Sequence, residues 1–146
     1  MKNLKLYHIP IAYMLVYILA ILATGMWLFL LSQGLGSSGI LQTLMRIATV
    51  PEPKSIHNFI EVATPHMFAI GTLIFVVAHF MLFSTKISQR FSLRVSVLLF
   101  IVALLNISAY LLIIFGVVVS GWVKLLLLGL FVLLFLLLLG MVAFSL

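Results

Sequence analysis

Four long apolar stretches with almost no charged residues constrain the fold of this 146-residue sequence more than any other feature. A lipid bilayer with a hydrocarbon core of about 30 Å is crossed by about 20 mostly apolar helical residues. Backbone polar groups in lipid have no water to bind, so a spanning segment must satisfy them internally, as a helix does. We therefore predict an all-α integral membrane protein with spans at residues 7–31, 65–83, 95–119 and 122–144.

The composition indicates one membrane domain rather than a soluble fold. Hydrophobic residues make up 66% of the chain and charged residues 7%, whereas soluble domains carry about 25% charged residues. Short loops join most of the spans, which predicts a single domain over residues 1–146, built as a four-helix up-and-down bundle. The sequence has no cysteine, no glycine-rich phosphate loop and no paired carboxylates, so it excludes disulfides, thiolate metal sites and the usual chemistry of soluble enzymes.

The net charge of +6 indicates a membrane topology rather than a nucleic-acid partner. Five of the eight basic residues precede the first span or lie in the short loop after the second: Lys2, Lys5, Lys86, Arg90 and Arg94. Basic loops stay on the cytoplasmic side of a membrane. We therefore predict a multi-pass protein of a bacterial-type cytoplasmic (inner) membrane, with both termini in the cytoplasm.

The outer loop, residues 33–64, contains a pattern typical of a short amphipathic helix at residues 40–50. One side of that helix carries Gln42, Arg46 and Thr49, and the other carries Leu41, Leu44, Met45 and Ala48. Such a helix is expected to lie on the outer membrane surface. There it either caps the bundle or docks a partner.

The start of the second span allows two interpretations. Thr64 and Pro65 fit the N-cap and the first position of a helix, with a separate short helix capped by Ser55 before them. The competing interpretation is one continuous helix from Ser55, kinked at Pro65.

Histidines are the main candidate ligands inside the membrane. An ionisable side chain in a span is costly, which makes each one a functional hypothesis. His8 begins the first span and His79 lies near the end of the second, so both belong to the cytoplasmic half. Because two neutral imidazoles on facing helices can ligate one haem iron, we predict a b-type haem held by His8 and His79. His57 and His66 are candidate cofactor ligands on the outer side.

The spacing of the histidines favours the cytoplasmic pair. His66 and His79 are 13 positions apart, which at about 100° per residue turns them about 140° away from each other. His57 and His66 differ by nine positions and face opposite sides of a continuous helix. Other interpretations stay open: His8 at the headgroup level, His79 as a structural hydrogen-bonding residue and His57 in a solvated loop.

Glu61 is the acidic residue closest to a span, and it lies between His57 and His66 in the sequence. Oxidation of a quinol needs a base for the released proton and a donor to the ring oxygen. Glu61 and His66 are therefore a candidate quinone or proton site at the outer surface. The alternative is a surface carboxylate that faces Lys54.

Neutral polar residues form stripes on two spans. Asn106 and Tyr110 are one helical turn apart on the third span, and Tyr13, Tyr17 and Thr24 share a face of the first. Interhelical hydrogen bonds are the usual role of such residues. We therefore expect the first three spans to pack these stripes together, with the very apolar fourth span covering them from lipid.

The first span runs from Tyr7-His8-Ile9-Pro10 to Leu22-Ala23-Thr24-Gly25. It resembles the first span of four-helix membrane b-type cytochromes of the b561 and of the hydrogenase or formate dehydrogenase gamma-subunit kind. In those families a histidine at the start of span one ligates haem, and a Thr-Gly or Ser-Gly pair follows about four turns later. The resemblance implies a four-span fold and a role for His8 as a haem ligand.

Two functions compete on this evidence. The first is a small electron-transfer subunit that binds haem b and exchanges electrons with quinone or a partner protein. The second is a non-catalytic membrane subunit or assembly factor without a cofactor, within a larger complex or a homo-oligomer. A small transporter is disfavoured because no acidic residue lies deep in a span. In each case the lipid bilayer is the surrounding partner.

Overall fold

The computed structural model describes residues 8–35, 39–49, 51, 55–84, 86–118 and 120–146. The described chain contains five α-helices and one short 3-10 helix. In chain order they are α1 (His8–Ser32), α2 (Gly39–Thr49), α3 (Ile56–Phe80), η2 (Met81–Phe83), α4 (Gln89–Ile114) and α5 (Trp122–Ser145).

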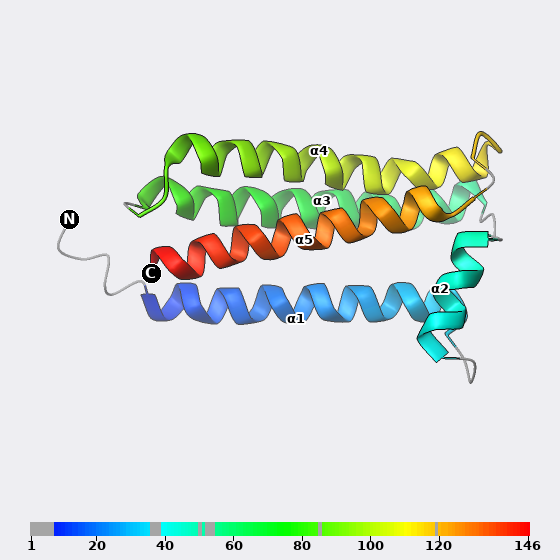
Figure 1. The fold of residues 1–146 in the computed structure, drawn as a ribbon, viewed down its shortest axis with the longest axis horizontal. Helices are drawn as coiled ribbons and strands as arrows, with labels where there is room; N and C mark the ends of the chain where they lie inside the picture. Colours follow the sequence, from blue (N-terminus) through cyan, green and yellow to red (C-terminus); the bar gives the residue numbers. More distant parts are fainter. Residues whose placement is uncertain (1–7, 36–38, 50, 52–54, 85, 119) are drawn as a thin grey trace.

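Four of these helices are long and apolar enough to cross a membrane: α1, α3 together with η2, α4 and α5. They alternate in direction, so that α1 begins and α5 ends at one end of the bundle, on the left in Figure 1. We call this the terminal end, and the opposite end, where α2 lies, the α2 end. The predicted all-α, four-helix up-and-down membrane bundle is confirmed.

The second span begins earlier than predicted. The Ser55 side chain caps α3 by accepting a hydrogen bond from the backbone N–H of Asn58 at 3.2 Å, and the helix then continues through Pro65. The predicted start of the second span at residue 65 is therefore wrong. The competing interpretation, in which one helix continues from Ser55 through Pro65, is right about the continuity of the helix. Pro65 has no backbone N–H to donate, so α3 loses one hydrogen bond there. The helix continues because its other turns keep theirs.

The third span is displaced towards the N-terminus relative to its prediction. α4 already begins at Gln89, because a helix continues beyond the hydrocarbon and carries Arg90 and Arg94 at its exposed start. It ends at Ile114, where Gly116 adopts a positive φ of 67° and the N–H of Val117 donates to the carbonyl oxygen of Leu112 at 2.9 Å. This closure is typical of a helix terminated by glycine.

The most apolar span, α5, connects α1 to the pair formed by α3 and α4. It contacts every other helix of the described chain, and α1 packs chiefly against it. Its buried side chains are Phe131, Leu134, Phe135, Leu138, Leu139, Met141 and Val142. The expectation that the first three spans pack together is wrong, because α1 packs chiefly against α5 and not against α3 or α4. Lipid tails are as apolar as leucine, so packing rather than polarity decides which helices are neighbours.

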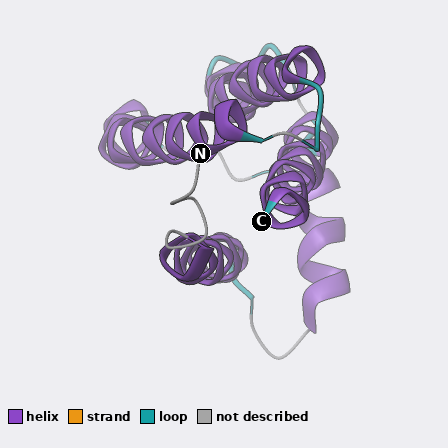
Figure 2. Ribbon diagram, turned by 90° about the vertical axis from the view of Figure 1, so that its left-hand side faces the viewer, coloured by secondary structure: helices purple, strands orange, loops and turns teal. Residues whose placement is uncertain are grey.

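Helix α1 lies apart from α3 and α4 when the bundle is viewed from its terminal end (Figure 2). Only Leu15 and Ile18 are buried on it. Tyr13 and Tyr17 are 75% and 69% exposed, so this polar stripe faces away from the bundle, contrary to expectation.

Helix α2 runs across the α2 end of the bundle (Figure 1) and docks on the segment that precedes α5. The carbonyl oxygen of Ala48 accepts hydrogen bonds from the Gly121 N–H at 3.1 Å and the Ser120 hydroxyl at 2.9 Å. Gly121 approaches α2 so closely that a Cβ atom there would collide with the carbonyl oxygen of Ile47. The α2 helix therefore caps the bundle, as one of the two interpretations of the loop predicts.

Arg46 joins α2 to the end of α1. Its guanidinium donates to the carbonyl oxygens of Gln33 and Gly34, the latter at 3.1 Å. Carbonyl groups that follow the last turn of a helix lack partners within the helix, and a cation is favourable there. The apolar residues Leu41 and Met45 are 67% and 58% exposed, so the face of α2 that packs differs from the face predicted.

Candidate functional site

A pair of hydrogen bonds between two spans joins Lys124 of α5 to Asn106 of α4. The Lys124 ammonium donates to the Asn106 main-chain carbonyl oxygen at 2.5 Å and to its side-chain Oδ1 at 3.0 Å. Asn106 is buried, with 7% of its surface exposed. The pair ties α5 to α4, its most extensively packed neighbour.

The position of this pair in the membrane is unusual for a lysine. Asn106 lies eight residues before the end of α4 at Ile114, a distance of about 12 Å along the helix. A lysine near the end of a span normally extends its ammonium group to the interface, whereas Lys124 directs it to neutral oxygens between two helices. Such placement of a charge is costly unless the group is hydrogen-bonded.

The sequence does not single out Lys124 as a site residue, because it lies at the start of the fourth span, where charged residues usually reach the membrane surface. The available signal was that Lys124 is the only charged residue in the stretch 122–144. Asn106 was expected to serve as interhelical glue, and it does so. Tyr110, one turn further along α4, stacks on Phe59 of α3 with ring centroids 6.3 Å apart.

His79 lies near the end of α3 between two aromatic rings of the same chain segment. The centroid of its ring is 6.0 Å from that of Phe75 and 5.8 Å from that of Phe83. No hydrogen-bond partner for its ring nitrogens is found in the described part of the chain. The imidazole is exposed, as are Phe75 and Phe83, and the three rings form one exposed aromatic stripe with spacings of four residues.

His8 is the first residue of α1 and is half-buried. The terminal end of the bundle carries both the start of α1 and the end of α3, so His8 and His79 lie at the same end, as predicted (Figure 1). The structure does not join them: α1 packs chiefly against α5, whereas His79 lines a hollow between α3 and α4. The haem site at His8 and His79 stays a prediction.

The outer residues lie along the first half of α3. His57, Glu61 and His66 are all exposed, and the His66 Nδ1 donates to the carbonyl oxygen of Val62 at 2.7 Å. Within the described residues no hydrogen bond or ion pair joins Glu61 to either histidine, and no group of three or more His, Cys, Asp or Glu side chains could hold a metal ion. Lys54, the alternative partner of Glu61, lies outside the described residues.

Basic residues gather at the terminal end. The Lys86 ammonium donates to the carbonyl oxygen of Phe144 at 2.9 Å and lies 5.5 Å from the centre of the Phe144 ring, which ties the loop between α3 and α4 to the end of α5. Arg90 and Arg94 are exposed on the first turns of α4. Lys2 and Lys5 lie outside the described residues.

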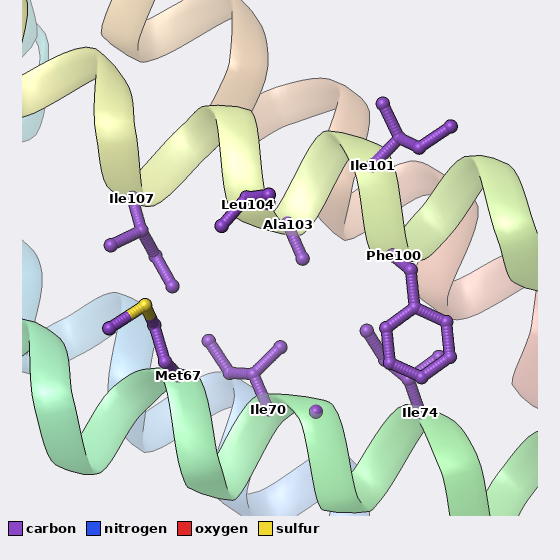
Figure 3. Close-up of a pocket in the computed structure, with 9 residues that line it drawn as sticks. Met67, Ile70, Ile74, Phe100, Ile101, Ala103, Leu104 and Ile107 are labelled. Atoms are coloured by element: carbon purple, nitrogen blue, oxygen red, sulfur yellow. The ribbon is translucent and has the colours of Figure 1, made fainter.

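Two adjoining hollows follow the seam between α3 and α4. The first encloses about 300 Å³ and is lined from α3 by Met67, Ile70, Gly71 and Ile74, and from α4 by Phe100, Ile101, Ala103, Leu104 and Ile107 (Figure 3). The second encloses about 240 Å³ nearer the terminal end, and it shares Phe100 with the first. Its lining includes the polar residues His79, Gln89, Ser92 and Ser96. We call the two hollows together the seam groove.

Comparison with known proteins identifies the kind of domain but not its activity. A family model described as a transmembrane helical domain matches residues 32–146, which leaves most of α1 outside the match. No curated protein and no solved structure matches the chain.

Proposed function

The chain belongs to the Aq_1264_TM family of transmembrane helical domains, and we propose that it acts as a non-catalytic integral membrane subunit that assembles with a partner helix through α1. The observation that carries this proposal is a regular seam on the exposed side of α1. Its members recur at alternating steps of four and three residues: Tyr13, Tyr17, Ala20, Thr24, Trp27 and Leu31. A repeat of seven residues is the pattern with which one helix packs along another.

The chemistry of this seam fits a protein partner better than lipid. Small residues such as Ala20 and Thr24 allow two helix backbones to approach closely in a membrane, where helix association depends on packing and hydrogen bonds. Tyr17 lies nine residues into α1, about 14 Å from its start, and no partner for its hydroxyl is found within the described chain. A tyrosine hydroxyl at that depth gains a hydrogen bond when a polar helix packs against it.

Other polar groups of the bundle support a structural role, because they stabilise this chain itself. Lys124 and Asn106 join two helices, and Arg46 joins α2 to α1. Ser96 and Thr24 donate to carbonyl oxygens of their own helices. The Tyr13 and Tyr17 hydroxyls differ from these groups, which is why we assign the external contact to α1.

Site-specific photo-crosslinking in native membranes tests this proposal. A benzoylphenylalanine at Tyr17 should yield a discrete protein adduct, either with a second copy of the chain or with another membrane protein. The control places the same probe at Leu133, which is 62% exposed on α5 and should yield lipid adducts only. Lipid adducts alone at Tyr17, or identical adducts at both positions, would refute the proposal.

A second candidate function is electron transfer through a b-type haem. The specific observation in its favour is that α1 begins and α3 ends at the same end of the bundle (Figure 1), and His8 and His79 belong to these two helix ends. Imidazole nitrogens about 2 Å from the iron on each side would hold the haem. The test is a reduced-minus-oxidised spectrum of protein expressed with sufficient haem. A haem band lost in His79→Leu supports this function, and no band in the native protein excludes it.

A further inference from the structure

We propose that the seam groove binds a membrane-soluble amphiphile of the quinone type, which has a neutral oxygenated ring and a long apolar tail. The first step of the argument is the continuity of the groove. Its two hollows share Phe100 and extend from the middle of α3 and α4 to the terminal end of the bundle. Both hollows are open at the bundle surface, and their volumes of about 300 and 240 Å³ lie at or just below the lower end of the range of about 300–1,000 Å³ for ligand sites.

The second step is the change in polarity along the groove. The hollow in the middle of the membrane is lined by apolar side chains and by Gly71, where an added Cβ would meet no atom within 4 Å (Figure 3). The hollow at the terminal end adds the polar side chains of His79 and Gln89. A ligand that fits both parts has an apolar chain towards the membrane centre and a polar head near the surface.

The third step concerns the charge of the head group. The basic residues Arg90 and Arg94 lie close by in the sequence, yet neither lines the groove, and its described lining contains no Lys, Arg, Asp or Glu. A phosphate head group would be left without a cation in this lining, whereas a neutral carbonyl or hydroxyl oxygen needs only hydrogen-bonding partners.

The fourth step is the ability of His79 to form hydrogen bonds with the head group. The His79 imidazole lies beside the rings of Phe75 and Phe83 on the exposed side of α3, and no partner for its nitrogens is found within the described chain. One nitrogen of a neutral imidazole donates and the other accepts, so the same ring can bind a quinone carbonyl or a quinol hydroxyl. Phe75 and Phe100 add aromatic surface of the kind that packs against a flat ring.

The experiment uses the full chain in phosphatidylcholine nanodiscs and an azido-quinone with a decyl tail as photoaffinity probe. Mass spectrometry should locate the adduct on α3 or α4 at the terminal end, and decylubiquinone should compete for it. His79→Leu removes the head-group partner, and Gly71→Leu fills the tail hollow. We expect each to weaken competition by decylubiquinone about tenfold, the usual cost of one lost hydrogen bond or of blocked apolar contact.

Gly129→Leu is the matched control, because a Cβ at Gly129 of α5 also meets no atom within 4 Å and this residue does not line the groove. It should leave competition within about twofold of the native value. If decanol competes as well as decylubiquinone, the groove accepts any acyl chain and the proposal is wrong. It is equally wrong if His79→Leu and Gly71→Leu behave like the control. The α1 crosslinks are read separately, so either proposal can fail alone.

Discussion

The contact between Gly121 and α2 provides the sharpest test of the fold. In Gly121→Ala the new methyl group occupies the space of the Ile47 carbonyl oxygen, so α2 must move away from α5. The backbone of Gly121 has φ −79° and ψ 0°, which alanine adopts without strain. The substitution therefore acts through the collision rather than through the local conformation of the chain.

The cost follows from what α2 loses when it undocks. Two hydrogen bonds to the Ala48 carbonyl oxygen are lost, each worth about 1 kcal/mol. The Ile47 side chain, 5% exposed in the docked state, also leaves its apolar contacts, which adds up to about 2 kcal/mol. We expect the docking equilibrium of α2 to weaken by about 2–4 kcal/mol, or roughly 30- to 900-fold.

The absence of cysteine from the sequence makes the assay direct. Thr43 is 1% exposed in the docked helix, and its hydroxyl bonds only to the Gly39 carbonyl oxygen of the same helix. Thr43→Cys in the native background should react slowly with a membrane-impermeant maleimide, and the added Gly121→Ala should accelerate this reaction by the factor above, up to the rate of an exposed thiol.

Gly129→Ala is the control on the same helix, since its methyl group meets no neighbouring atom and alanine favours helix formation. It should leave the maleimide rate unchanged. If Gly121→Ala also leaves the rate within about twofold of the parent, α2 does not dock through this contact and the reasoning is refuted.

Two further predictions concern the cations that join helices. Asn106→Leu leaves the Lys124 ammonium without its side-chain acceptor and should lower the free energy of unfolding in detergent by about 1–3 kcal/mol. Lys124→Met removes the buried charge that needs this acceptor, so it should lower the free energy of unfolding by less. Equal losses in a denaturant titration would contradict this asymmetry. Arg46→Met frees the carbonyl oxygens of Gln33 and Gly34 and should destabilise the end of α1 by about 1–2 kcal/mol, seen as faster amide hydrogen exchange at residues 28–35 than in the native chain. Unchanged exchange there would show that Arg46 does not hold α1.

The sequence predicted the spans and the amphipathic helix because these depend on local chemistry. The length of an apolar stretch determines whether it can form a transmembrane helix. The helical periodicity of polar and apolar residues around Arg46 predicts α2. The boundaries were less predictable at Pro65 and at Arg90, since a helix continues past a proline or a charge when its remaining hydrogen bonds are satisfied.

At the candidate site, too, some features of the histidines follow from the sequence and others do not. The sequence placed His8 and His79 at one end of the bundle, because helix direction follows from the order of the spans. The contacts of His79 with Phe75 and Phe83 follow from their spacing of four residues along one helical segment, whereas the position of His79 beside α4 depends on the rotation of α3 about its axis. Rotation is set by packing with neighbours and leaves little trace in a nearly uniform apolar sequence.

By itself, the sequence determined that this chain crosses a membrane four times, since lipid leaves an unpaired backbone no alternative to helices. Only the tertiary structure decided the order of the helices around the core. It placed the leucine-rich α5 between α1 and the other spans, turned Tyr13 and Tyr17 outward and brought Lys124 to Asn106. The physical reason is that lipid and protein interior are equally apolar, so close packing and a few hydrogen bonds choose among arrangements that hydrophobicity does not distinguish.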